Sequence, residues 1–149
     1  MKTATRLIAL TIITLFSISN TSIAQAQEHT VTLVCNSDEL RTKKTHEACY
    51  FAQDPDVDPR EFLITVDVGD VILWDGQSVS GEDRIDIKKI KWDKGTKIFD
   101  EDFIDGIETV VGTVKYDTKD KKDFKYTIQF KVNDSEKMYK IDPKVRVNP

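Results

Sequence analysis

The cysteines are the first residues whose chemistry can be judged, because the chain has only two of them, Cys35 and Cys49. A thiol redox site requires the Cys-x-x-Cys spacing, and a structural zinc site requires more sulfur or imidazole ligands at short spacing. Neither pattern is present. A single pair of cysteines in an oxidising compartment favours a structural disulfide. We therefore predict a Cys35–Cys49 bridge that closes a polar loop and leaves no free thiol.

One of the two histidines has a position that suits metal binding. Cleavage of a leader after Ala26 would start the mature chain at Gln27-Glu28-His29. A histidine in third place lets the free amine, two backbone nitrogens and the imidazole form a square-planar site for Cu(II) or Ni(II). Cyclisation of Gln27 would remove the amine, and cleavage after Ala24 would change the spacing. His29 is a candidate ligand on these terms, and we expect no resident cofactor.

Carboxylates at alternate positions, Asp54, Asp56 and Asp58, are spaced as in a calcium-binding loop. Pro59 stands where such a loop needs a glycine for its sharp turn, and Thr65 stands where it needs a closing bidentate glutamate. We therefore expect a solvated turn, with an irregular calcium site as the alternative. The acidic segment 100–105 lacks the same elements and has the same interpretation.

The residue types needed for hydrolytic catalysis do not form a recognisable set. Segment 76–81, Gly-Gln-Ser-Val-Ser-Gly, is close to a nucleophile elbow, but its second glycine is displaced and no helix is predicted after it. We predict a hairpin loop there. Glycoside cleavage needs two carboxylates at a defined separation, and nothing singles out one pair among the 26 acidic residues.

The first 26 residues have the pattern of a secretory signal. Lys2 and Arg6 give a positive start, residues 7–18 form an apolar stretch, and Ala24-Gln25-Ala26 is a small-x-small cleavage sequence. We predict residues 1–26 as a signal peptide and 27–149 as one domain that is periplasmic or secreted. An uncleaved anchor is the alternative, but the apolar stretch is shorter than the roughly 20 residues of a membrane span. No later segment is apolar enough to span a bilayer.

The charge balance narrows the choice of partners. The whole chain has a formal net charge of −4, and removal of the leader takes away two further positive charges. We therefore expect no nucleic-acid binding. The lysines at 88, 89, 91, 94 and 97 form the densest basic stretch, a possible face for an anionic partner, although Asp86 and Asp93 weaken that interpretation.

Strand patterns fill most of the mature chain. Alternating or β-branched residues predict strands at 30–35, 62–68, 71–74, 85–92, 107–116 and 125–132, and a last strand near 138–147 that pauses at Asp142 and Pro143. We expect a turn at Asp75 and Gly76, and a β-bulge at Lys88 and Lys89 where the alternation changes phase. A helical turn fits only around 99–104 or in the disulfide loop. Trp74 and Trp92 fall in strands, so core packing is expected for both, with sugar or peptide stacking as the alternative.

Two segments carry a resemblance to a known family. The run Val66-Asp67-Val68-Gly69-Asp70-Val71-Ile72-Leu73-Trp74 resembles the cupredoxin stretch in which a valine-rich strand meets Gly-Asp and continues to a tryptophan. Segment 124–147 is similar in layout to the last two cupredoxin strands. The resemblance implies an antiparallel Greek-key β-sandwich. An immunoglobulin-like sandwich is the alternative for the same all-β pattern.

The copper ligands of that family are missing from this chain. In cupredoxins a tyrosine-rich strand leads to Cys, His and Met, which bind type 1 copper together with an earlier His. Here segment 124–130 is followed by neither Cys nor His, and Met138 is the only sulfur after it. A blue-copper centre needs a thiolate and two imidazoles at one point. The resemblance therefore implies the sandwich without its electron-transfer site.

These observations favour one function over another. We predict an exported, noncatalytic β-sandwich that binds a protein, peptide or glycan through a sheet edge or its loops. The alternative is a metal carrier, with Cu(II) or Ni(II) at the amino terminus or calcium in a loop, or an enzyme with a site of scattered carboxylates. The sequence does not identify the partner.

Overall fold

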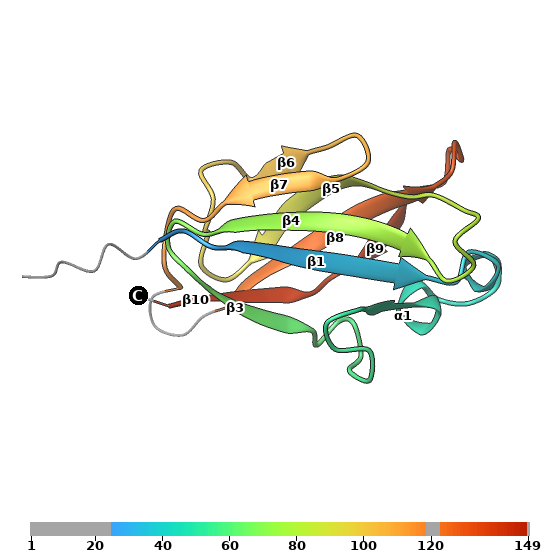
Figure 1. The fold of residues 1–149 in the computed structure, drawn as a ribbon, viewed down its shortest axis with the longest axis horizontal. Helices are drawn as coiled ribbons and strands as arrows, with labels where there is room; N and C mark the ends of the chain where they lie inside the picture. The colour runs from blue at the N-terminus through green and yellow to red at the C-terminus, as the bar shows by residue number, and fades with distance from the viewer. Residues whose placement is uncertain (1–24, 119–122, 149) are drawn as a thin grey trace, which may run out of the picture.

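Ten strands and two short helices make up the described part of the computed structural model, residues 25–118 and 123–148 (Figure 1). Residues 1–24 of the predicted signal peptide lie outside the described residues. The helices are the 3-10 helix η1 (Glu39–Arg41) and α1 (Thr45–Ala48). The strands are β1 (Glu28–Cys35), β2 (Cys49–Phe51), β3 (Leu63–Asp67), β4 (Val71–Ser78), β5 (Ile85–Lys94), β6 (Phe103–Asp105), β7 (Val110–Thr113), β8 (Phe124–Val132), β9 (Tyr139–Ile141) and β10 (Lys144–Asn148).

The strands form two sheets that pack face to face. One sheet has the order β2-β1-β4-β7, and the other has the order β3-β10-β8-β5-β6, with β9 also paired to β8. In Figure 1, β1 and β4 lie in front of β8. This arrangement confirms the prediction of an all-β sandwich.

Both sheets are mixed, whereas we expected antiparallel pairing throughout. β1 runs parallel to β4 from Glu28↔Val71 to Cys35↔Ser78, and β10 runs parallel to β3. Hydrophobic alternation shows which face of a strand is buried, but it is the same for either direction of the neighbouring strand. The parallel pairs could therefore not be read from the sequence. The Greek-key and cupredoxin-like topology stays a prediction.

The predicted β-bulge is confirmed, and the predicted turn after Trp74 is wrong. The register between β5 and β8 shifts between Ile87 and Lys89, so Lys88 is the extra residue. β4 continues through Asp75 and Gly76 to Ser78. Gly76 is suited to this place because a Cβ atom there would collide with the backbone carbonyl and side chain of Ile85 on β5. The glycine therefore marks a close approach between strands.

Short elements account for the remaining differences. β2 and β6 are three residues each, too short to show a period. The helical turn expected in the disulfide loop is present as η1 and α1, whereas segment 99–104 leads into β6 instead. Within residues 25–118 and 123–148, no helix has the length and apolar character that crossing a membrane requires.

The centre of the core is aromatic. Trp74 and Tyr126 are fully buried between the sheets, and the indole Nε1 of Trp74 donates a hydrogen bond to Tyr126 Oη at 3.1 Å. Burial raises the pKa of the Tyr126 phenol. Phe99 and Phe124 meet at 5.4 Å between ring centroids. The core position predicted for Trp74 is confirmed, and Trp92 packs against the core while partly buried.

Candidate functional site

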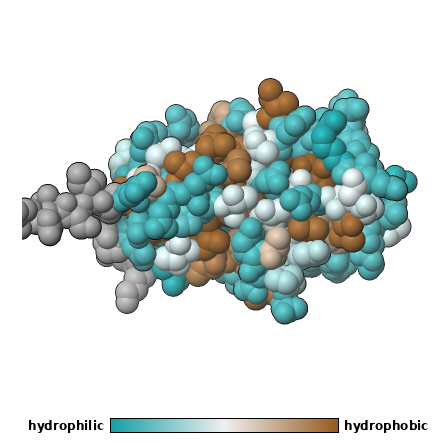
Figure 2. Space-filling model, viewed as in Figure 1, coloured by the Kyte–Doolittle hydropathy of each residue, from teal (hydrophilic) through white to brown (hydrophobic). Residues whose placement is uncertain are grey.

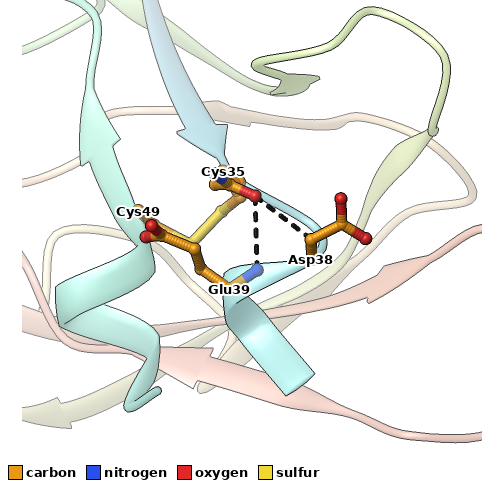
Figure 3. Close-up of a disulfide and its surroundings, with 5 residues drawn as sticks. Cys35, Asp38, Glu39 and Cys49 are labelled. Atoms are coloured by element: carbon orange, nitrogen blue, oxygen red, sulfur yellow. Dashed lines mark hydrogen bonds between the residues drawn. A yellow bond between two sulfur atoms is a disulfide. The ribbon is translucent and has the colours of Figure 1, made fainter. Parts of the chain in front are cut away.

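The two cysteines form a buried disulfide. Cys35 ends β1, Cys49 begins β2, and the two residues are direct cross-strand partners. Their sulfur atoms are bonded at 2.09 Å, and Figure 3 shows the bridge between the two strands. The side-chain oxygen of Asn36 accepts hydrogen bonds from the N–H groups of Asp38 and Glu39, each at 3.2 Å. The predicted bridge is confirmed, and its burial suits a structural role.

His29 lies in β1 and contacts a buried carboxylate. Its Nε2 is 2.7 Å from Oδ2 of Asp70, which is 4% exposed. Asp70 also accepts hydrogen bonds from the backbone N–H groups of Gln27 and Asp67, both at 2.9 Å. Burial by itself would raise the pKa of Asp70, but these hydrogen bonds to the ionised form outweigh it, and the pKa lies below its ordinary value.

Two nitrogen atoms of the candidate copper site have another partner in this structure. The backbone nitrogen of Gln27 and Nε2 of His29 both contact Asp70, and residues 28 and 29 lie in the ladder between β1 and β4. A square-planar site would therefore require the start of β1 to leave the sheet.

The three aspartates of the candidate calcium loop do not converge. Asp58 accepts hydrogen bonds from the backbone and guanidinium of Arg60, which hold the pKa of its carboxyl well below the ordinary value. Asp54 forms an isolated bridge with Phe51 through its backbone. Across the part of the chain that the structure describes, no group of three or more His, Cys, Asp or Glu side chains is arranged to hold a metal ion.

The serine segment and the lysine row are also explained by local contacts. Ser78 Oγ and Ser80 Oγ are 3.0 Å apart, and the chain continues from them into β5 rather than a helix. The predicted hairpin loop is wrong, because β4 and β5 belong to different sheets and the segment connects the two. Three lysines of the row are paired with carboxylates: Lys88 with Asp86, Lys89 with Asp105 and Lys97 with Asp102. Much of the positive charge of the row is therefore neutralised.

A cleft lies where the edges of the two sheets meet. β7 is the last strand of one sheet and β6 the last strand of the other, and Figure 1 shows them side by side. The cleft between them has a volume of about 390 Å³. Its lining combines the carboxylates Asp100, Glu101 and Asp105 with a single cation, Lys115.

Apolar side chains are exposed at this cleft and its connecting loop. Phe103 on β6 is 49% exposed, Val111 on β7 is 54% exposed, and Ile107 in the loop between these strands is 80% exposed. Lys89 Nζ lies 4.1 Å from the centroid of the Phe103 ring. On the face of the molecule that Figure 2 shows, hydrophobic patches are separated by hydrophilic residues. Phe103 and Val111 therefore provide apolar contact area beside the open strand.

The outer edge of β7 has unpaired backbone groups. Val114 N donates to Asp70 O at 2.8 Å, so positions 114 and 70 form a hydrogen-bonded pair. Bonded and non-bonded pairs alternate in an antiparallel ladder. The N–H and C=O groups of Val111 and Thr113 therefore point away from β4, and among the described residues no strand pairs with them.

Sequence reasoning missed both the open edge and Asp70. The alternation of Val110 to Thr113 indicates a strand but not its place at an edge, and β6 is too short to show a pattern. In the sequence, Asp70 is distinguished only as a member of the cupredoxin-like run. Its contacts with Gln27 and His29 depend on the parallel pairing of β1 with β4.

No protein-family model matches this chain, and no curated protein matches it. One solved structure with a similar fold is the inclusion body protein PixA from Burkholderia cenocepacia J2315, with a TM-score of 0.57 and 12% sequence identity. The similarity covers 83% of this chain and 96% of the PixA chain. At this identity the likeness establishes the fold alone.

Proposed function

We propose that this protein is an exported, noncatalytic β-sandwich that binds an extended peptide segment of a partner protein along β7. The observation on which the proposal depends is the unpaired row of N–H and C=O groups at Val111 and Thr113 beside an open cleft. A peptide can add to such an edge as a further strand, with its main chain providing affinity and alternate side chains providing specificity.

The chemistry of the cleft defines the partner segment. Val111 and Phe103 offer apolar contact, so alternate residues of the peptide should be apolar. Asp105 is paired with Lys89, so the lining carboxylates without an ion pair among the described residues are those of Asp100 and Glu101, and they outnumber the single lining cation, Lys115. The remaining residues of the peptide should therefore be basic, since complementary charge steers and orients association.

Export and the loss of copper binding belong to the same proposal. The signal pattern of residues 1–26 and the buried Cys35–Cys49 bridge support a periplasmic or secreted protein. The cupredoxin-like assignment is supported by the run from Val66 to Trp74, and the missing thiolate and imidazoles argue against type 1 copper.

The test uses two matched proline variants. The probe is a fluorescein-labelled peptide of alternating lysine and valine, and its binding is followed by fluorescence anisotropy. In T113P, proline removes an outward N–H of β7 without breaking a bond to β4, and its ring obstructs the edge. T65P makes the same change on β3, the edge strand of the other sheet. Lys144 N donates to Phe62 O, so alternation points the Thr65 N–H outward as well.

We expect T113P to weaken peptide binding about tenfold or more, the equivalent of losing one or two backbone hydrogen bonds. T65P should bind as the wild type does. Equal loss in both variants, or no loss in T113P, would contradict the assignment to β7. Sedimentation of the protein without peptide measures whether it self-associates. If the wild type self-associates and T113P does not, the edge pairs with a second copy and a peptide partner is ruled out.

A further inference from the structure

The segment before β1 is attached to the segment before β4. Because β1 and β4 are parallel and begin at the same level, Gln27 and Asp70, the residues just ahead of them, lie side by side. The carbonyl oxygen of Gln27 accepts a hydrogen bond from Val71 N at 2.8 Å, and the backbone nitrogen of Gln27 donates to Asp70 Oδ1 at 2.9 Å. Gln27 is therefore bound through both of its backbone polar groups.

Asp70 is a buried anion with no lysine or arginine contact among the described residues. Its polar partners are the N–H of Asp67, the backbone nitrogen of Gln27 and the imidazole of His29. Of these, only His29 and the Gln27 nitrogen can become cationic. A buried carboxylate is stabilised far more by a positive donor than by a neutral one. The position of the Gln27 nitrogen therefore suits an ammonium group.

Gln27 is also the residue that leader removal would expose. We propose that Asp70 is the receptor for the α-amino group created at Gln27 when the signal peptide is removed, so that processing completes the fold. This inference rests on the proposed export with cleavage after Ala26. A peptidase of the export route adds water across the Ala26–Gln27 bond. Ala26 keeps the carboxylate, and Gln27 gains an amine that takes up a proton at neutral pH.

The consequence is a charge-assisted hydrogen bond in place of a neutral one. The α-ammonium of Gln27 faces Asp70 Oδ1, while His29 faces Oδ2, so the two donors do not compete for one oxygen. The mature chain should be more stable than a chain in which Gln27 keeps a peptide bond to Ala26. Cyclisation of Gln27 would cancel this gain. Its amine would attack the side-chain amide carbon, ammonia would leave, and the resulting lactam N–H would have no charge.

The test compares two purified, disulfide-bonded chains that contain every strand, one beginning at Gln27 and one at Gln25. Each is prepared with Asp70 and with D70N, and intact mass verifies that Gln27 has not cyclised. A Q27S chain, which cannot cyclise, serves as the control. At neutral pH, the melting temperature of the chain that begins at Gln27 should be on the order of 3–6 °C higher than that of the chain that begins at Gln25. D70N should abolish that difference.

An NMR titration gives an independent result if D70N does not fold. The α-amine at Gln27 should have a pKa above the ordinary range of about 7.7–8.0, whereas the α-amine at Gln25 should lie within that range. An ordinary pKa at Gln27, or a melting difference that persists in D70N, would overturn the proposal. Neither measurement involves β7, so failure here is distinguishable from failure of peptide binding at T113P.

Discussion

Replacing both cysteines, as C35A/C49A, should destabilise the protein by about 3 kcal/mol in the chain-entropy model. The bridge joins two residues that lie 14 positions apart in the sequence. Without it, the unfolded chain regains the freedom of that loop. The native geometry should not offset this loss, because Cys35 and Cys49 are already cross-strand partners in the ladder between β1 and β2.

The structure also predicts which part of the protein opens first when the bridge is removed. β2 is an edge strand held by three paired positions, and its far end is anchored by Phe51, whose ring lies 4.1 Å from that of Phe62 between centroids. The end at Cys49 is joined to the end of β1 by the bridge and by the hydrogen bond from Asn36 N to Ala48 O. In the variant, the hydrogen bond from Asn36 N to Ala48 O should open first. Hydrogen exchange at the Asn36 amide should therefore accelerate more than exchange in the core strands.

Urea unfolding followed by tryptophan fluorescence measures the global effect, since Trp74 is fully buried and reports on the core. V79A is the matched control. Val79 follows the last residue of β4 and its apolar side chain is exposed, so removing that side chain should leave the urea midpoint unchanged. If C35A/C49A lowers the free energy of unfolding by less than about 1 kcal/mol, the chain-entropy model is refuted, because it requires a loss of about 3 kcal/mol. Unchanged exchange at Asn36 would refute the local part.

Three other outcomes follow from the core and from Asp70. Y126F leaves the buried Nε1 of Trp74 without an acceptor and should cost about 1–3 kcal/mol in thermal unfolding; a variant as stable as the wild type would contradict this. G112A places a Cβ 2.8 Å from Ile104 Cδ1, 3.0 Å from the buried ring of Phe99 and 3.2 Å from that of Trp74; because the rings have little room to move, the change should cost about 1–3 kcal/mol by overpacking, and adding I104V should recover part of the loss. D70N tests the sign of a pH effect, because the folded pKa of Asp70 lies below its ordinary 3.8. Asp70 therefore stabilises the fold above that value, and its contribution is lost as the pH falls through the folded pKa. The difference in urea midpoint between wild type and D70N should be full at neutral pH and should shrink as the pH falls below the ordinary value of 3.8 and through the lower folded pKa; a constant difference would contradict the assignment.

Several features could be predicted from the residues themselves. Alternation from Lys125 to Val132 identified the central strand β8, and the change of phase at Lys88 identified the bulge. The pairing of Cys35 with Cys49 followed from there being only two cysteines. These features depend on local period or on counting, so they need no knowledge of neighbouring strands.

Other features depend on which strands become neighbours. The turn expected at Gly76 is a strand because β5 approaches its backbone, a contact made by Ile85. β6 became recognisable only through its pairing with β5. The same limit applies to the candidate site, since nothing in the sequence of Val111 and Thr113 indicates that one side of their strand has no partner.

The sequence by itself determined that the chain is built from strands, that its thiols are used in one bridge, and that ligands for type 1 copper are missing, because each of these follows from residue type and spacing. The tertiary structure decided that β7 lies at an open edge and that Asp70 lies against Gln27 and His29. The physical reason is that strand alternation specifies the buried face, while hydrogen bonding between distant segments selects the neighbour and its direction.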